Sequence, residues 1–306
     1  MNLEPVNQTK LYAFYDEFNQ LIQLHKENNL PNKILLSGQK GIGKCTFAYH
    51  IVNYVLSLGE ENSYDLKNFQ INEENKSFKL NLNKSNPNFI LVDVSSEKKN
   101  IDINQIKDLI KNLNKSSFNS KERFVLIDNI EYLNISSINA LLKVIEEPND
   151  DTFFILINNN KKINSTLTSR CIKFNLSLSN SKTLSVCEKL VGENIYNLIN
   201  EDLIDYYLTP GKIYNLVKFS HDNKVDLSKK SLKDFINLII HENLYKKETS
   251  IKYFIYDFIE LFLRKNISLK SNYLFHNFIE QIDRIKRYNL DEESLFIKLR
   301  SELING

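Results

Sequence analysis

Residues suited to phosphate chemistry occupy one stretch near the start of this 306-residue chain. An apolar run at 33–37 leads into Gly38-Gln39-Lys40-Gly41-Ile42-Gly43-Lys44, and a helical segment at 44–57 follows. Glycines let backbone N–H groups converge on an anion, and a helix N-terminus adds partial positive charge. Strand, glycine-rich loop and helix together predict a nucleotide-binding loop. Its expected nucleotide-binding residues are Gly38, Gly41, Gly43, Lys44, Cys45 and Thr46.

Position 45 departs from the usual form of this loop, which has Ser or Thr after the lysine to bind Mg²⁺. The chain has Cys45 there, and Thr46 comes one residue late. Magnesium prefers oxygen ligands, and Thr46 lies about 100° further round a helix of 3.6 residues per turn. We therefore expect phosphate binding to survive and metal positioning to be compromised.

A second stretch that could serve the same site is the apolar run 124–127, which ends in Asp128 and Asn129. Asp128 would lie at the carboxyl end of a parallel strand, where a carboxylate can approach a metal beside the phosphate. The next residue in many such ATPases is the catalytic acid, but the amide of Asn129 cannot accept a proton from water. Glu131, two residues later, is expected to point elsewhere. These residues predict a weak or vestigial nucleotide site that requires no cofactor and is compatible with ATP or ADP bound without turnover.

Two further sets of polar residues lie next to predicted strands, one after a strand and one before a strand. Asn158, Asn159 and Asn160 end the apolar run 152–158, where they could sense a phosphate or form a solvated turn, with the two readings weighted equally. Arg170 precedes the last apolar run, 172–174. Its planar fork suits a phosphate or an acidic partner, and the alternative is a surface salt bridge that contributes little stability.

The elements that must position these residues alternate between short apolar runs and amphipathic helices, which is typical of an α/β fold with a parallel sheet. A further strand is expected at 88–94, and helices are expected at 9–28, 103–113 and 136–146, the last stopped by Pro148. Residues 59–85 suggest a surface insertion with a short strand. From residue 180 onward the pattern is helical throughout, and Ile251–Leu263 is apolar almost all round, so it should be buried.

Bulk composition limits the function classes. The net charge is +2 with a pI of about 8.2, which is not typical of a strong autonomous DNA-binding protein. The cysteines Cys45, Cys171 and Cys187 have neither metal-ligand spacing nor a disulfide pattern, so we expect no zinc and no other metal. The apolar helix at 251–263 is too short to span a membrane, and a cytoplasmic location is expected.

The stretch Asn139–Pro148, NALLKVIEEP, followed by Ser169-Arg170-Cys171, closely resembles bacterial clamp-loader subunits of the AAA+ superfamily. Asn86–Asn88, Ile101–Lys107 and Thr209-Pro210-Gly211-Lys212 also resemble motifs of this family. The resemblance covers residues 1–220. It implies an AAA+ P-loop module at 1–177, a helical lid at 178–222 and an all-α collar domain for oligomerisation at 223–306.

The resemblance also implies roles for particular residues. Arg170 would be an arginine finger that acts in trans on ATP held by a neighbouring subunit, and Lys212 would contact nucleotide from the lid. Cys45 and Asn129 favour the branch of the family that hydrolyses little or no ATP over the gamma/tau-type motors. The implied partners are gamma/tau and delta clamp-loader subunits, with the sliding clamp and primer-template DNA reached through the complex. The chain would thus belong to a DNA-directed DNA polymerase assembly. The alternatives are an active gamma/tau-like ATPase and a standalone DNA-binding protein.

Overall fold

The computed structural model describes residues 3–95, 100–114, 121–147, 151–205, 208–247, 249–265, 272–288 and 290–301. The chain divides into two compact units. The first is Met1–Val186 together with Thr209–Gly211, and the second is Cys187–Leu208 together with Lys212–Gly306. The three-part division at residues 177 and 222 stays a prediction.

A five-stranded parallel sheet lies at the centre of the first unit, in the order β2-β3-β4-β1-β5. Each strand matches one of the apolar runs in the sequence, so the α/β class with a parallel sheet is confirmed. Because the strands are parallel, their carboxyl ends meet at one edge of the sheet. The strands are β1 (Lys33–Ser37), β2 (Phe89–Val92), β3 (Arg123–Ile127), β4 (Thr152–Asn158) and β5 (Ile172–Asn175).

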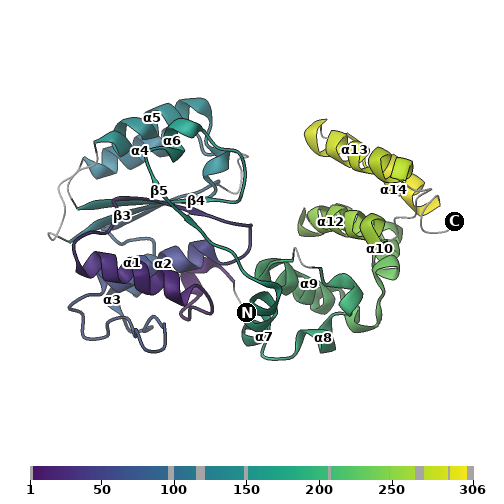
Figure 1. Cartoon of the computed structure of the whole chain (residues 1–306), viewed down its shortest axis with the longest axis horizontal. Helices are drawn as coiled ribbons and strands as arrows, with labels where there is room; N and C mark the ends of the chain where they lie inside the picture. Colours follow the sequence, from purple (N-terminus) through teal and green to yellow (C-terminus); the bar gives the residue numbers. More distant parts are fainter. Residues whose placement is uncertain are drawn as a thin grey trace. The chain divides into compact units, whose positions relative to one another are not determined.

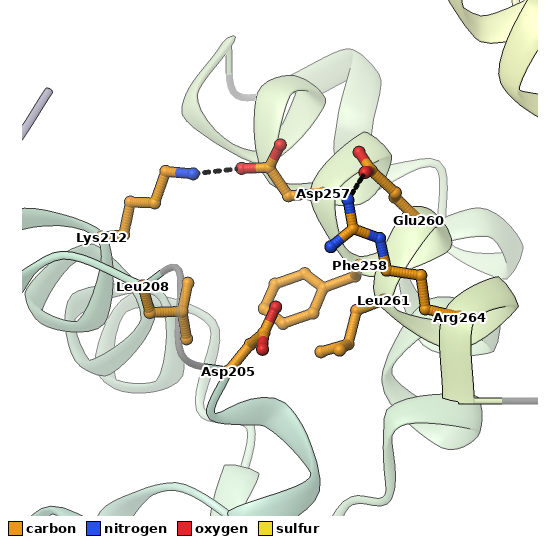
Figure 2. Close-up of a pocket in the computed structure, with 8 residues that line it drawn as sticks. All are labelled: Asp205, Leu208, Lys212, Asp257, Phe258, Glu260, Leu261 and Arg264. Atoms are coloured by element: carbon orange, nitrogen blue, oxygen red, sulfur yellow. Dashed lines mark hydrogen bonds and ion pairs between the residues drawn. The ribbon is translucent and has the colours of Figure 1, made fainter. Parts of the chain in front are cut away.

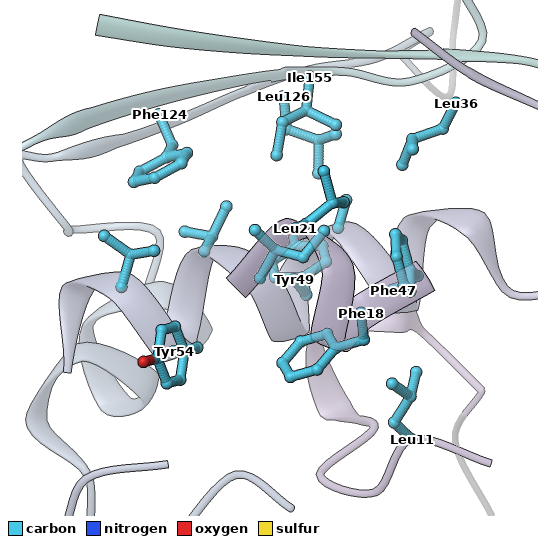
Figure 3. Packing of buried hydrophobic residues seen from close by; sticks show 14 of the residues in the cluster. Leu11, Phe18, Leu21, Leu36, Phe47, Tyr49, Tyr54, Phe124, Leu126 and Ile155 are labelled. Atoms are coloured by element: carbon cyan, nitrogen blue, oxygen red, sulfur yellow. The ribbon is translucent and has the colours of Figure 1, made fainter. Parts of the chain in front are cut away.

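Helices cover both faces of this sheet (Figure 1). One face carries α1 (Tyr15–Lys26), α2 (Lys44–Leu56) and α3 (Lys76–Leu82), and the other carries α4 (Ile103–Leu113), α5 (Ile135–Glu146) and α6 (Ser165–Thr168). Figure 3 shows the core on the first face, where strand residues point at aromatic side chains of α1 and α2. Leu36, Leu126 and Ile155 from three strands are at most 1% exposed, as are Phe18 and Phe47 from the helices.

Two expectations for the first unit are wrong in detail. The insertion at 59–85 contains helix α3 and not a strand, because Asn75 caps the helix by accepting from the Phe78 N–H, and Phe78 is buried. The first helix begins at Tyr15 and not at residue 9. Its preceding segment bonds to the insertion instead, with the Leu11 N–H donating to the Phe69 carbonyl.

The helices α4 and α5 on the other face each begin at a polar N-cap residue whose side chain accepts a hydrogen bond from the first turn. The expected capping box of α4 is present, with the Asp102 side chain accepting from the Gln105 N–H and the Gln105 side chain accepting in return. Asn134 caps α5 by accepting from the Ser137 N–H. Pro148, the predicted stop of α5, lies outside the described residues.

The second unit is helical throughout its described residues, as the sequence predicts. The apolar helix predicted at 251–263 lies within α12, and its described side chains are largely buried, as Phe254, Phe258 and Ile259 show. No helix in the described ranges is both long and apolar enough to cross a membrane. The helices from residue 180 onward are α7 (Asn180–Val191), α8 (Ile195–Leu198), α9 (Pro210–Asn223), α10 (Leu232–His241), α11 (Leu244–Lys247), α12 (Thr249–Lys265), α13 (Asn272–Tyr288) and α14 (Glu293–Leu299). Short 3₁₀ turns are η1 (Pro5–Asn7), η2 (Ile130–Tyr132), η3 (Glu201–Leu203) and η4 (Leu227–Lys229).

Candidate nucleotide site and arginine edge

The predicted phosphate loop connects β1 to α2 at the carboxyl edge of the sheet. Gly41 and Gly43 have φ angles of +88° and +96°, a region that side chains rarely adopt, so glycine is needed for the turn. No side chain caps α2 at Gly43. The first N–H groups of a 13-residue helix therefore face the loop, which is the geometry of an anion site.

The lysine of the loop, Lys44, is buried and bonded to its own loop. Its Nζ donates to the carbonyls of Gly38 and Gln39 at 2.9 and 2.7 Å, and to Asn159 Oδ1 at 2.9 Å. Burial lowers the pKa of Lys44 to about 8, against the opposing effect of the nearby Asp128 and Glu131 carboxylates. A phosphate that bound here would have to exchange with these oxygen acceptors.

Cys45 and Asp128 lie close enough beside the loop for the thiol and the carboxylate to influence each other's pKa. Burial raises the pKa of Asp128 to about 6, and repulsion from Asp93 adds to the shift. Burial also raises the pKa of the Cys45 thiol well above its ordinary value. A buried, neutral thiol is a poor magnesium ligand because Mg²⁺ prefers oxygen. The residues present thus fit a phosphate group but not the usual Mg²⁺ ligand set.

Asn159, at the end of β4, connects the polar groups of the site. Its Nδ2 donates to Asn129 Oδ1 and to Glu131 Oε1, both at 2.8 Å. The expectation that Glu131 points elsewhere is wrong, because the 3₁₀ turn η2 directs its carboxylate back toward the end of β4. The bonds of Asn159 to Lys44 and Asn129 favour a place within the site for this asparagine. Asn158 instead supports the turn, because its Nδ2 donates to the Lys161 carbonyl at 3.1 Å and its Oδ1 accepts from the Lys161 N–H at 3.2 Å.

Asp93 was missed in the sequence, although it directly follows the apolar strand β2 as Asp128 follows β3. Its Oδ1 accepts from Asn129 Nδ2 at 2.8 Å, and Gln105 Nε2 donates to its carbonyl at 2.8 Å. Among the residues that the structure describes, no group of three or more His, Cys, Asp or Glu side chains is arranged to hold a metal. The acidic groups of the site instead accept hydrogen bonds from amides.

Asn129 has a left-handed backbone, with φ and ψ of 58° and 47°. Asparagine adopts this conformation more readily than most side chains because its short amide bonds locally. Its amide joins Asp93 to Asn159 but offers no basic atom for activating water. Asn129 therefore links the ends of β2 and β4 at the site.

Arg170 lies at the opposite, amino edge of the sheet, between α6 and β5. Its Nη2 is 2.6 Å from Glu146 Oε1, and its Nη1 donates to the Thr166 carbonyl at 2.8 Å. The side chain of Arg170 is 36% exposed and that of Glu146 49%. The structure thus brings the loop residues together with Asp128, but it separates them from Arg170.

Lys212, which is expected from the resemblance to contact nucleotide, forms an ion pair with Asp257 within the second unit. Its Nζ donates to Asp257 Oδ2 of α12 at 2.5 Å, as Figure 2 shows. The preceding residues of the same motif bond to the loop, with Thr209 Oγ1 donating to the Lys40 carbonyl and the Gly211 N–H to the Gly41 carbonyl, both at 2.9 Å. A nucleotide contact by Lys212 stays a prediction.

A five-stranded parallel sheet with a phosphate loop after β1, an acid after β3 and a polar amide after β4 defines an AAA+ P-loop module. The profile of one family, described as "DNA polymerase III, delta subunit", matches residues 15–180, which is more than half of the chain. The chain therefore belongs to this clamp-loader family of DNA polymerase III, and its relatives support the delta-prime members as its branch.

The curated relatives match part of this chain. The chain is 32% identical over 166 residues to DNA polymerase III subunit delta' of Buchnera aphidicola subsp. Baizongia pistaciae, covering 52% of this chain and 48% of the relative. It is 28% identical over 162 residues to the delta' subunit of Buchnera aphidicola subsp. Schizaphis graminum, covering 53% and 47%. It is also 28% identical over 221 residues to the gamma subunit of the latter organism, covering 71% and 53%. The chain thus spans about half the length of the curated relatives it matches.

Proposed function

We propose that this chain acts as a delta-prime-type subunit of a clamp loader, which assembles with gamma/tau and delta subunits to load the sliding clamp on primed DNA. In this role Arg170 serves as an arginine finger toward ATP held by a neighbouring subunit. The chain itself hydrolyses little or no ATP. Family membership supports the assembly, and the positions of particular residues support the division of labour within it.

The observation that carries the proposal is the separation of Arg170 from the phosphate loop of its own chain. In the sheet register, Ile172 pairs with Ile34 and Asn175 pairs with Ser37, and the loop begins just beyond Ser37. Arg170 precedes the first of these pairs, so all four residues of β5 lie between it and the level of the loop. At about 3.3 Å per residue the strand alone spans roughly 13 Å. An arginine side chain does not reach that far, so a phosphate that meets Arg170 must come from another molecule.

The loop of this chain supports the second part of the proposal. Cys45 removes the hydroxyl that would bind magnesium, and Asn129 removes the base that would activate water. Lys44 is already bonded to two loop carbonyls and to Asn159. Residues at the loop can hold a phosphate through Gly41, Gly43 and the start of α2, but they lack two groups that turnover needs.

The test uses the reconstituted complex with gamma/tau-type and delta-type subunits, and measures DNA- and clamp-stimulated ATP hydrolysis. Arg170→Ala should leave assembly intact and abolish the turnover that depends on the adjoining site, because arginine fingers contribute about 10³–10⁵ to kcat. The matched control is Lys173→Ala, which removes an exposed positive charge three residues away on β5. Unchanged ATPase in the assembled Arg170→Ala complex would refute the finger role.

A separate measurement tests whether this chain is itself a motor. The isolated chain should turn over ATP far more slowly than about 1 s⁻¹, the lower end of common kcat values. Turnover at that rate or faster would favour a gamma/tau-like ATPase in place of the proposed function.

A further inference from the structure

We propose that Glu146 is the positioning residue for Arg170, holding its guanidinium at the amino edge of the sheet in the orientation that a neighbour's phosphate meets. The inference rests on the proposed finger role and adds a second residue to it. Glu146 is the last residue of α5, and it has no contact with the phosphate loop among the interactions of the described residues. Its carboxylate acts through Arg170 and not on a nucleotide.

Two bonds from two different elements fix the plane of the guanidinium. Glu146 Oε1 at the end of α5 lies 2.6 Å from Nη2, and the Thr166 carbonyl of α6 accepts from Nη1 at 2.8 Å. A planar group held at both terminal nitrogens cannot rotate about its long axis without losing one bond. The fork is therefore oriented before any partner arrives.

With these two bonds in place, the guanidinium of Arg170 can still bind a phosphate. A guanidinium has five N–H donors, and two of them are used here. Within the described ranges the other three have no protein partner, and the side chain is 36% exposed. A phosphate can therefore bind to the remaining donors without displacing Glu146.

The size of the effect follows from the exposure of the pair. Exposed ion pairs are weak, but an arginine side chain that is held in one orientation gives up much of its rotamer freedom. Glu146 restrains part of that freedom. Its removal should therefore lower kcat at the adjoining site by about 2- to 5-fold, far less than removal of Arg170 itself. Because ATP is bound by the other subunit, the KM for ATP should not change.

The experiment is a double-mutant cycle in the reconstituted complex, with Glu146→Ala, Arg170→Ala and both together. Glu147→Ala is the matched control, because Glu147 is exposed, adjacent and equally charged. We expect Glu146→Ala to lower kcat 2- to 5-fold with KM unchanged, Glu147→Ala to have no effect, and Glu146→Ala to add nothing once Arg170 is absent. Glu146→Asp should restore part of the lost rate, because it keeps the charge one methylene further from Nη2.

A second readout requires neither partners nor activity. In the isolated chain, ¹⁵N relaxation at Nε of Arg170, assigned by its loss in Arg170→Ala, should report a restrained side chain in the wild type and a mobile one in Glu146→Ala. If Arg170→Ala lowers the ATPase but Glu146→Ala changes neither rate nor relaxation, the positioning role is wrong and the finger role stands. A higher rate in Glu146→Ala would also overturn it, by showing that the pair restrains the finger. If Arg170→Ala itself has no effect, the proposed function fails first.

Discussion

His50 provides a test of how the helix behind the phosphate loop is held, because a buried imidazole reports its surroundings through pH. It lies on α2 and is fully buried. Its Nε2 lies 3.0 Å from the Gln8 carbonyl, and its Nδ1 lies 2.8 Å from the Tyr64 hydroxyl. A carbonyl can only accept, so Nε2 carries the proton and Nδ1 accepts from Tyr64 in the neutral ring. One side chain thus joins the N-terminal segment, α2 and the insertion after it.

The direction of the pH effect follows from the lowered pKa. Burial lowers the pKa of His50 from 6.5 to about 4, against the opposing hydrogen bond to Gln8. Above about pH 6.5 the ring is neutral in both the folded and the unfolded chain. As the pH falls from about 6.5 to about 4, the unfolded chain binds a proton that the folded chain does not. The free energy of unfolding should therefore fall by about 1.4 kcal/mol per pH unit, or about 3 kcal/mol in all.

The direct measurement is a titration of the histidine ring signals by NMR, with the His50 signal assigned by its loss in His50→Gln. We expect this signal to stay unchanged from pH 8 down to about 5. Urea unfolding between pH 7.5 and 4.5 should show a smaller pH dependence in His50→Gln than in the wild type. His221→Gln, which changes an exposed histidine, is the control and should behave as the wild type. A His50 signal that titrates near pH 6.5 would refute the buried, neutral assignment.

Two further predictions concern the phosphate loop. Gly41→Ala should destabilise the first unit more than Gly43→Ala in chemical unfolding. At both positions an alanine would be strained by about 1–2 kcal/mol in the left-handed region. A Cβ at Gly41 would also come within 2.6 Å of Thr209 Oγ1, whereas a Cβ at Gly43 meets nothing within 4 Å. Equal losses in the free energy of unfolding for the two variants would contradict this prediction. Cys45→Ser should make the binding of a fluorescent ATP analogue tighter in MgCl₂ than in EDTA, because it restores a hydroxyl beside Asp128. The wild type should show no such gain, and an equal gain in both proteins would show that the thiol does not limit metal binding.

Much of the first unit could be predicted from local sequence. Short apolar runs predict buried strands because a parallel sheet covered on both faces needs apolar residues along its whole length. The glycines of the loop and the capping box at Asp102 also act within a few residues, so their signals are local. The predicted start of the first helix was wrong because a distant segment offers other hydrogen-bond partners. Residues 9–14 bond to the insertion near Phe69 and do not extend α1.

The candidate site was partly predictable for the same reason. Lys44, Cys45 and Asp128 stand at characteristic places in the sequence, immediately after the strands that position them. Asp93 and Glu131 were missed or misplaced because their roles depend on which strands are neighbours. Strand order is set by packing between segments far apart in the chain, and it places the end of β3 between those of β2 and β4.

By itself, the sequence determined the class of fold and the chemical departures at Cys45 and Asn129, since residue type alone decides whether a hydroxyl or a base is present. The tertiary structure alone decided where Arg170 stands. The register of β5 against β1 places it at the edge opposite the loop of its own chain, beside Glu146. That separation exists because parallel strands put all their carboxyl ends on one side, and it is the physical reason to look for its phosphate in another subunit.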